Sequence, residues 1–169
     1  KIDFNKLISK IFPVEQADKA FESLVDSNSN NIGVLISYSN EEDVSSYKNR
    51  IDINSSIVEG KINVGLIGAG SFASRVHLPN IVKNSKYYNL LAICSKNPSN
   101  LKISGEKFNP NYISTDYNEL LNDSKINLIV ITTKHDTHGK LVIEALKKGK
   151  NVLVEKPLAI KNNELVEIE

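Results

Sequence analysis

The sequence predicts an α/β fold: a doubly wound parallel sheet over residues 61–169, preceded by a small strand–helix–strand appendage. Three observations support this fold class. Short apolar segments alternate with helical segments throughout residues 61–169, as in β-α-β units. One of these segments, Leu128–Ile131, is apolar at every position, which is typical of a strand covered on both faces. A smaller strand–helix–strand pattern in residues 1–40 has too little apolar surface to fold alone.

The chain divides into a small first part, a linker and a larger second part. The elements expected in residues 1–40 are a strand, a helix and a strand: residues 6–12, 14–25 and 32–38. Residues 41–60 are polar and lack a clear period, which predicts a linker with a short strand near Ile51–Ile53. We therefore expect a domain boundary in this linker.

Residues 61–169 carry the alternating pattern. The expected strands are residues 62–67, 90–94, 112–114, 128–131 and 152–154. The expected helices are residues 71–84, 115–121 and 137–148, with a weak helical or loop segment at 98–107. Thr115 is the expected cap of the 115–121 helix. Gly149 suits the left-handed residue that ends the last of these helices.

Composition excludes several classes of protein. The chain has 169 residues, 40% of them hydrophobic, and a formal net charge of +1, which argues against nucleic-acid or anionic-membrane binding. One cysteine allows no disulfide framework and no cysteine-rich zinc site. No apolar run is long enough to cross a bilayer, and the N-terminus lacks the layout of a signal peptide. These features predict a cytoplasmic protein that has no membrane partner.

A glycine pattern follows the first strand of the second part. Residues 68–73 have the form G-x-G-x-x-A between a strand and a helix. In a dinucleotide site, Gly68 makes the tight turn, Gly70 lets a pyrophosphate approach, and Ala73 lets the helix pack closely. The helix start at Ser71 and Phe72 would face the phosphates. The pattern predicts a dinucleotide site, and the alternative is a plain tight turn.

Cofactor choice depends on the end of the second strand. An NAD site usually has an acid there to bind the adenosine ribose. This strand ends in Ser95 and Lys96 instead, and a hydroxyl with an ammonium suits the 2′-phosphate of NADP better. The residues therefore favour NADP over NAD. The alternative is that Lys96 is a solvated lysine and that NAD is still accepted.

Polar residues also follow the strand at 128–131. Thr132 and Thr133 are candidates for hydrogen bonds to the ribose or nicotinamide, because ligands of doubly wound folds bind at this strand end. His135 and His138 lie in the same segment and join the cofactor-binding candidates. Their spacing also fits metal ligands on a helix, but no further ligand is evident nearby, so we predict no metal site.

The last motif is Glu155-Lys156-Pro157, again at a strand end. Pro157 restricts the backbone, and its peptide bond is a candidate for the cis form. A lysine beside a glutamate in a cleft can polarise a carbonyl or move a proton, which makes Lys156 the catalytic candidate. The alternative is an ordinary surface pair.

These motifs together resemble the Gfo/Idh/MocA oxidoreductase family. The resemblance covers about residues 61–169 and rests on four segments: residues 64–70, the Thr132–His138 segment, residues 145–150 and residues 155–159. It implies an NAD(P)-binding Rossmann domain followed by an α/β substrate domain. It also implies hydride transfer to or from a hydroxyl of a sugar or cyclitol. In such an enzyme Lys156 is expected at the nicotinamide and substrate, and Glu155 at or near the cofactor ribose.

Residues 4–40 resemble the closing segment of zinc-type, medium-chain alcohol dehydrogenases. The segments that carry this resemblance are residues 11–21 and 33–36. Both resemblances in this order are similar to fusions of the two families, which hints at a nucleotide-sugar substrate. The chain has no methionine and ends soon after the Glu-Lys-Pro motif, so we expect a fragment that lacks the substrate domain and is inactive alone. The alternative function is a non-catalytic NAD(P)-binding regulatory or interaction module, and a homo-oligomer stays open.

Overall fold

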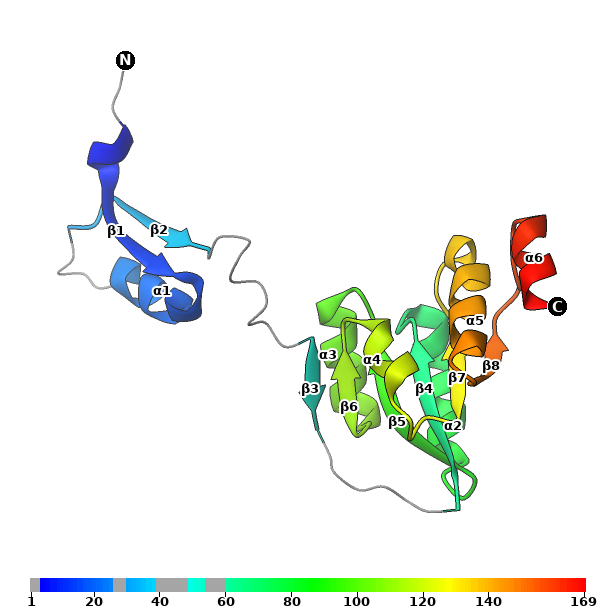
Figure 1. Cartoon of the computed structure of the whole chain (residues 1–169). Helices are drawn as coiled ribbons and strands as arrows, with labels where there is room; N and C mark the ends of the chain where they lie inside the picture. Colours follow the sequence, from blue (N-terminus) through cyan, green and yellow to red (C-terminus); the bar gives the residue numbers. More distant parts are fainter. Residues whose placement is uncertain (1–3, 26–29, 39–48, 54–59) are drawn as a thin grey trace. The chain divides into compact units, whose positions relative to one another are not determined.

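The computed structural model describes residues 4–25, 30–38, 49–53 and 60–169 (Figure 1). The chain forms two compact units, Lys1–Lys48 and Asn49–Glu169. Among the described residues, none of the helices has both the length and the apolar character needed to cross a membrane.

The first unit is a parallel pair of strands joined through a helix. Its elements are η1 (Phe4–Leu7), β1 (Ile8–Pro13), η2 (Val14–Gln16), α1 (Ala17–Val25) and β2 (Gly33–Ser37). The strand expected from Lys6 begins at Ile8 instead, because the preceding residues turn into a 3-10 helix. Among the described residues of this unit, Ala20 is the buried hydrophobic one, whereas Ile11 and Phe21 are 60% and 64% exposed. The unit thus has the small apolar core that the sequence predicts.

The second unit is built on a six-stranded sheet. Its strands are β3 (Arg50–Asp52), β4 (Ile62–Ile67), β5 (Tyr88–Cys94), β6 (Tyr112–Ser114), β7 (Leu128–Ile131) and β8 (Asn151–Val154). Their order across the sheet is β3-β6-β5-β4-β7-β8. All neighbours pair in parallel except β3, which runs antiparallel to β6. The doubly wound parallel sheet is confirmed, and the strand predicted near Ile51–Ile53 forms one edge of it.

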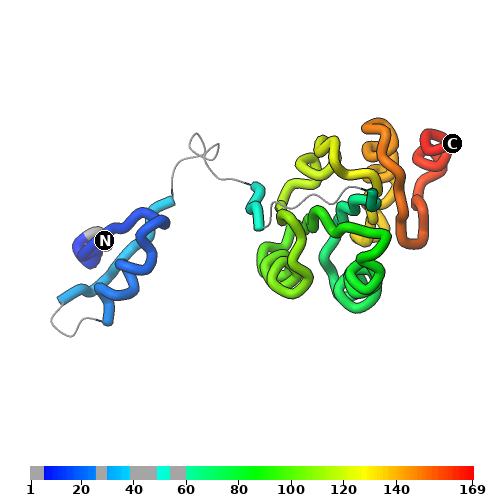
Figure 2. The backbone as a smooth tube through the Cα atoms, turned by 90° about the horizontal axis from the view of Figure 1, so that it is seen from below, coloured from blue at the N-terminus to red at the C-terminus, as the bar shows by residue number. Residues whose placement is uncertain are grey.

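Helices cover both faces of this sheet, as Figure 2 shows. The helical elements are η4 (Ala73–His77, a π-helix), α2 (Leu78–Lys83), α3 (Pro98–Phe108), α4 (Tyr117–Asn122), η5 (His135–Thr137, a 3-10 helix), α5 (His138–Lys147) and α6 (Asn162–Ile168). Leu66 and Val130 point to the core under α2 and α3. Ile67 and Ile131, one residue further along each strand, point to the core under α4 and α5. This two-sided burial explains why β7 is apolar throughout.

Two local expectations need correction or refinement. Thr115 does not cap the following helix, because its amide donates to the Asn49 carbonyl at 2.9 Å and continues the strand pairing. The cap is Asp116, whose carboxylate accepts from the Asn118 amide at 2.9 Å. The weak segment at 98–107 is a full helix, α3, because Asn97 caps its first turn.

The cysteine at the end of β5 provides a test of the packing. Cys94 is 2% exposed. Burial, with a contribution from Asp116, raises the pKa of the Cys94 thiol from 9.0 to about 12. The folded protein therefore keeps the thiol neutral, and we expect iodoacetamide to modify it only after unfolding in urea.

The same shift predicts how stability depends on pH. The unfolded chain loses the Cys94 proton near pH 9 and the folded chain near pH 12. Between these values the folded state binds more protons, so its free energy of unfolding falls as pH rises, by about 1.4 kcal/mol per unit at most. Urea unfolding at about pH 8 and about pH 10.5 measures this fall. Cys94→Ala is expected to remove the part due to the thiol, and an equal fall in that variant would contradict the assignment.

Candidate functional site

The strand ends that carry the predicted motifs lie along one edge of the sheet. Backbone hydrogen bonds join them in series. Gly68 N–H donates to Cys94 O at 2.8 Å, and Thr132 N–H donates to Ile67 O at 2.9 Å. Glu155 N–H donates to Ile131 O at 3.0 Å. The segments that follow β4, β5, β7 and β8 therefore form one continuous edge.

Gly68 makes the turn that follows β4. Its φ of +107° lies in a region that residues with a side chain rarely adopt. A Cβ built on Gly68 would lie 2.7 Å from the carbonyl carbon of Thr132 and 2.8 Å from the Thr133 nitrogen. The side-chain hydroxyl of Thr132 donates to the Gly68 carbonyl at 2.8 Å. The turn is therefore packed directly on the segment after β7, and only glycine fits there.

Gly70 differs from Gly68 because it faces open space. A Cβ built on Gly70 would meet no heavy atom within 4 Å. Ser71 and Phe72, the next two residues, are exposed, whereas Ala73 is fully buried against the core. The first amides of a helix have no acceptors within the helix. The turn thus leaves room for a phosphate group beside exposed amides, and the residues present fit the pyrophosphate of a dinucleotide.

β5 is followed by Ser95 and Lys96, the two residues that the sequence predicts to bear on cofactor choice. Ser95 is half-buried and Lys96 is exposed. Ser95 N–H donates to Ser114 O at 3.1 Å, and the Ser95 hydroxyl accepts from the Asn97 amide at 3.2 Å. Lys96 and Asp116 act in opposite directions on the nearby Cys94 thiol, lowering and raising its pKa. A cation and a carboxylate therefore both lie near the end of this strand.

The segment after β7 is held by its own hydroxyls. The Thr137 hydroxyl donates to the Thr133 hydroxyl or the Lys134 carbonyl, each at 2.7 Å. Thr132 and Thr133 are half-buried, and His135 is exposed. Thr132, Thr133 and His135 thus lie on the same edge as the glycine turn.

His138 lies behind this segment and is fully buried. Its Nε2 is 3.1 Å from the Thr133 carbonyl oxygen, and its Nδ1 is 2.8 Å from the Pro157 carbonyl oxygen. Both ring nitrogens therefore face protein acceptors, and the ring offers no open face to a ligand. The structure brings His138 beside the other cofactor candidates but surrounds it with protein.

The Glu-Lys-Pro segment leaves the end of β8 at the same edge. The peptide bond between Lys156 and Pro157 is cis, as the sequence suggests. Lys156 is exposed, and Glu155 is half-buried. Oε1 of Glu155 lies 2.7 Å from Nε2 of His77, which comes from the π-helix η4. No periodicity or spacing in the sequence marks His77 as a partner of Glu155.

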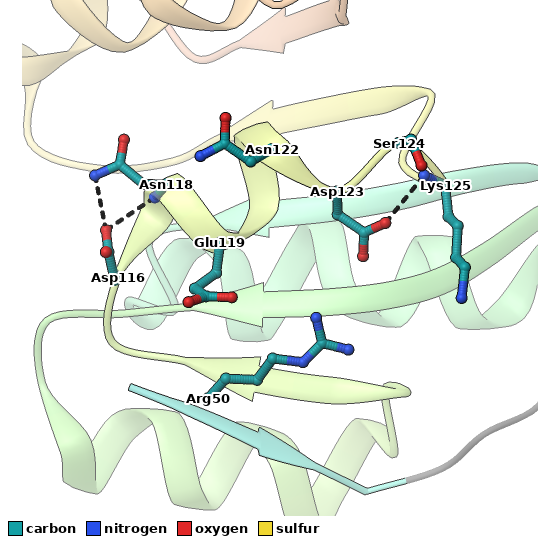
Figure 3. A pocket seen from close by; sticks show the side chains of 8 residues that line it. All are labelled: Arg50, Asp116, Asn118, Glu119, Asn122, Asp123, Ser124 and Lys125. Atoms are coloured by element: carbon teal, nitrogen blue, oxygen red, sulfur yellow. Dashed lines mark hydrogen bonds between the residues drawn. The ribbon is translucent and has the colours of Figure 1, made fainter. Parts of the chain in front are cut away.

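A separate polar hollow lies beside α4 (Figure 3). It has a volume of about 490 Å³ and is lined by Arg50, Asp116, Asn118, Glu119, Asn122, Asp123, Ser124 and Lys125. The Tyr112 hydroxyl donates to Oδ2 of Asp123, one of these lining residues, at 2.9 Å. Burial and the nearby Asp123 raise the pKa of Tyr112, so this hydroxyl stays protonated. None of the predicted cofactor residues lines this hollow.

Within the residues that the structure describes, no group of three or more histidine, cysteine, aspartate or glutamate side chains gathers closely enough to hold a metal ion. His135 and His138 have ring centroids 5.7 Å apart in an edge-to-face arrangement. The two histidines contact each other through their rings.

Known proteins share this domain. Residues 62–169 match the profile of an oxidoreductase family with an NAD-binding Rossmann fold. The chain is 29% identical over 106 residues to inositol 2-dehydrogenase/D-chiro-inositol 3-dehydrogenase of Lactiplantibacillus plantarum. The aligned region covers 62% of this chain and 30% of that protein. It is 32% identical over 96 residues to the uncharacterized oxidoreductase YhhX of Escherichia coli, and the aligned region covers 57% of this chain and 28% of YhhX.

Solved structures give the same result. KijD10, a 3-ketoreductase from Actinomadura kijaniata solved with NADP and TDP-benzene, is 27% identical, with a TM-score of 0.58 over 64% of this chain and 33% of that one. The WlbA dehydrogenase of Bordetella pertussis, solved with NADH and UDP-GlcNAcA, is 25% identical to this chain, with a TM-score of 0.60. The match covers 67% of this chain and 33% of the WlbA chain.

The chain spans about a third of the length of these relatives. The family profile nevertheless matches well over half of the chain, and it covers every strand end described above. This chain belongs to the Gfo/Idh/MocA oxidoreductase family, whose domain here is an NAD-binding Rossmann fold.

Proposed function

We propose that the whole protein is an NAD(P)-dependent oxidoreductase that transfers hydride to or from a hydroxyl carbon of a sugar or nucleotide-sugar. The substrate class is supported by the relatives, which include an inositol dehydrogenase and two enzymes solved with TDP-benzene or UDP-GlcNAcA. Within this protein, residues 61–169 supply the dinucleotide site. One structural observation carries the proposal: the glycine turn leaves open space at Gly70 while Lys156 follows a strand end on the same edge.

Each segment of the edge has a separate role in this proposal. The turn and helix start at residues 68–73 would hold the pyrophosphate through backbone amides. Thr132, Thr133 and His135 would contact the nicotinamide half, and Glu155 the ribose. A bound dinucleotide supplies the hydride chemistry. The ammonium of Lys156 would then polarise the substrate oxygen and relay its proton.

Cofactor choice is proposed to favour NADP. Ser95 and Lys96 occupy the strand end where the ribose 2′ position would lie, and a 2′-phosphate would accept charge-assisted hydrogen bonds from them. The nearby carboxylate of Asp116 opposes this preference, because it repels a phosphate. It already caps α4 through its bond to the Asn118 amide. We therefore propose that Lys96 decides the balance.

A fluorescence titration of the chain with NADPH and NADH tests the site and the preference. We expect NADPH to bind more tightly. Lys96→Ala is expected to weaken NADPH about tenfold, the loss of one charge-assisted bond, and to leave NADH nearly unchanged. Lys102→Ala, a change of an exposed lysine within α3, is the matched control. A clear preference for NADH would refute the choice of cofactor, and binding of neither would refute the proposed site.

We further propose that residues 1–40 close an alcohol-dehydrogenase-like domain in the whole protein. The first unit supports this, because its β-α-β arrangement leaves Ile11 and Phe21 largely exposed. Amides of β1 and β2 are then expected to exchange hydrogen at least about tenfold more slowly in the whole protein than in this chain. Equal exchange rates would contradict this proposal.

A further inference from the structure

Two histidines contact the Glu155–Pro157 segment from opposite faces of the sheet. His77 comes from η4, next to α2, and contacts the Glu155 carboxylate at 2.7 Å. His138 begins α5 on the other face and contacts the Pro157 carbonyl at 2.8 Å. The two contacted residues are the immediate neighbours of Lys156. The catalytic candidate therefore lies between two attachment points.

His138 also contacts a second segment, the residues that follow β7. The ring is fully buried, and its other nitrogen faces the Thr133 carbonyl at 3.1 Å. A neutral imidazole has one N–H and donates to one of the two carbonyls, whereas an imidazolium donates to both. In either form the ring fills the space between the segment after β7 and the segment after β8. Removing it would leave a gap between these two segments and take away the ring N–H that one of the carbonyls accepts.

The contact made by His77 links the Glu-Lys-Pro segment to the glycine turn. The side chains of His77 and Glu155 are 18% and 29% exposed, so water reaches the pair only in part. Phe72, at the helix start, packs edge-to-face on the His77 ring with centroids 5.4 Å apart. The segment that carries Lys156 is thus connected to the region that would hold the pyrophosphate.

We propose that His77 and His138 are positioning residues that fix the backbone on both sides of Lys156. This inference rests on the proposed role of Lys156. β8 pairs with β7 along one side and is the last strand of the sheet. Besides the Glu155 N–H bond to Ile131 O, the hydrogen bonds described for residues 155–158 are those to the two histidines. No hydrogen bond or ion pair of the Lys156 ammonium was found in the described part of the chain. Its position is therefore set by the backbone, and the backbone by the two histidines.

NMR relaxation of the chain without cofactor tests this directly. In the unaltered chain the amides of Lys156 and Leu158 are expected to have order parameters near about 0.85, typical of rigid backbone. His138→Ala and His77→Ala are each expected to lower at least one of them below about 0.6. The hydrogen-bonded amide of Glu155 is expected to exchange at least about tenfold faster in either variant. Unchanged order parameters for the Lys156 and Leu158 amides in both variants would refute the proposal.

Two control comparisons separate positioning from a general loss of stability. Leu141→Ala removes a buried side chain from the same helix as His138 but touches neither segment neighbouring Lys156 in the contacts described. It is expected to lower the melting temperature and leave the order of Lys156 unchanged. Glu155→Gln keeps an acceptor for His77 and should retain the order that Glu155→Ala loses. The inference would be overturned if Leu141→Ala lowered the Lys156 order parameter as much as His138→Ala does. It would also be overturned if Glu155→Gln lowered it as much as Glu155→Ala.

Kinetics of the whole protein give a second readout. A positioning role predicts that His77→Ala lowers kcat about tenfold and changes the KM for the dinucleotide less than threefold. A rise in KM with kcat retained would instead make His77 a binding residue and refute the inference. The failure of the proposed function is distinguishable, because it would appear as a chain that binds no dinucleotide while the NMR result stands.

Discussion

Replacing Gly68 by alanine is expected to destabilise the second unit by about 3 kcal/mol or more. Two costs add. The φ of +107° is strained for any residue with a side chain, and the new Cβ would lie 2.7 Å from the Thr132 carbonyl carbon. Those neighbours are backbone atoms directly after β7, and the Thr132 N–H is hydrogen-bonded to Ile67 O, so they cannot move aside without disturbing that bond. Urea unfolding followed by circular dichroism measures the loss.

Gly70→Val is the matched comparison. Its Cβ would enter open space, so we expect the free energy of unfolding to change by less than about 1 kcal/mol. The added side chain would occupy the space proposed for the pyrophosphate, and we expect the Kd for the dinucleotide to rise roughly 30-fold or more. The two glycines thus separate folding from binding. A Gly70→Val variant that binds dinucleotide normally would show that the pyrophosphate does not lie there.

Lys156→Ala is expected to lower kcat of the whole protein by about 10²- to 10⁴-fold, the range for losing a general acid or base. The cause is the loss of an ammonium that would polarise the substrate oxygen as hydride moves. The Kd for the dinucleotide should change little, because the proposed pyrophosphate contacts are backbone amides that follow β4, which is separated from β8 by β7 in the sheet. Steady-state kinetics with a cofactor titration measures both quantities.

Lys161→Ala serves as the control for that experiment. Lys161 is a nearby exposed lysine whose ammonium lies 4.0 Å from Glu164, so its loss removes a similar surface charge away from the strand end. We expect kcat to stay within about twofold. If Lys156→Ala behaved like Lys161→Ala, Lys156 would have no part in the chemistry. A parallel loss of cofactor affinity in Lys156→Ala would make it a binding residue instead.

Much of the Rossmann domain could be predicted because local signals and tertiary packing agree there. The β4 and β7 segments are short and almost wholly apolar, so the residues alone show that both faces are covered. Gly149 ends its helix at a φ of +69°, where glycine is favoured. The glycine turn could be recognised because its spacing reflects a backbone requirement. Such requirements are local and therefore visible in a linear sequence.

Other features depend on partners far apart in the chain. Thr115 and Asp116 are both residue types that cap helices, but the Thr115 N–H is bonded to the Asn49 carbonyl and Asp116 caps α4. The π-helix η4 has no marker in its sequence, although it carries His77 to Glu155 across a separation of 78 residues. His138 lies in the segment expected to bind cofactor, yet its burial turns both nitrogens toward backbone carbonyls.

The sequence by itself determined the α/β class, the strand and helix order of the second unit, and the residue types along its ligand edge. These follow from hydrophobic period and from the backbone freedom of glycine, which are properties of neighbouring residues. Only the tertiary structure decided which of these side chains are exposed and which are buried or bonded between segments. That distinction depends on burial and on hydrogen bonds between distant segments, because packing the two faces of the sheet brings His77 and His138 to either side of Lys156.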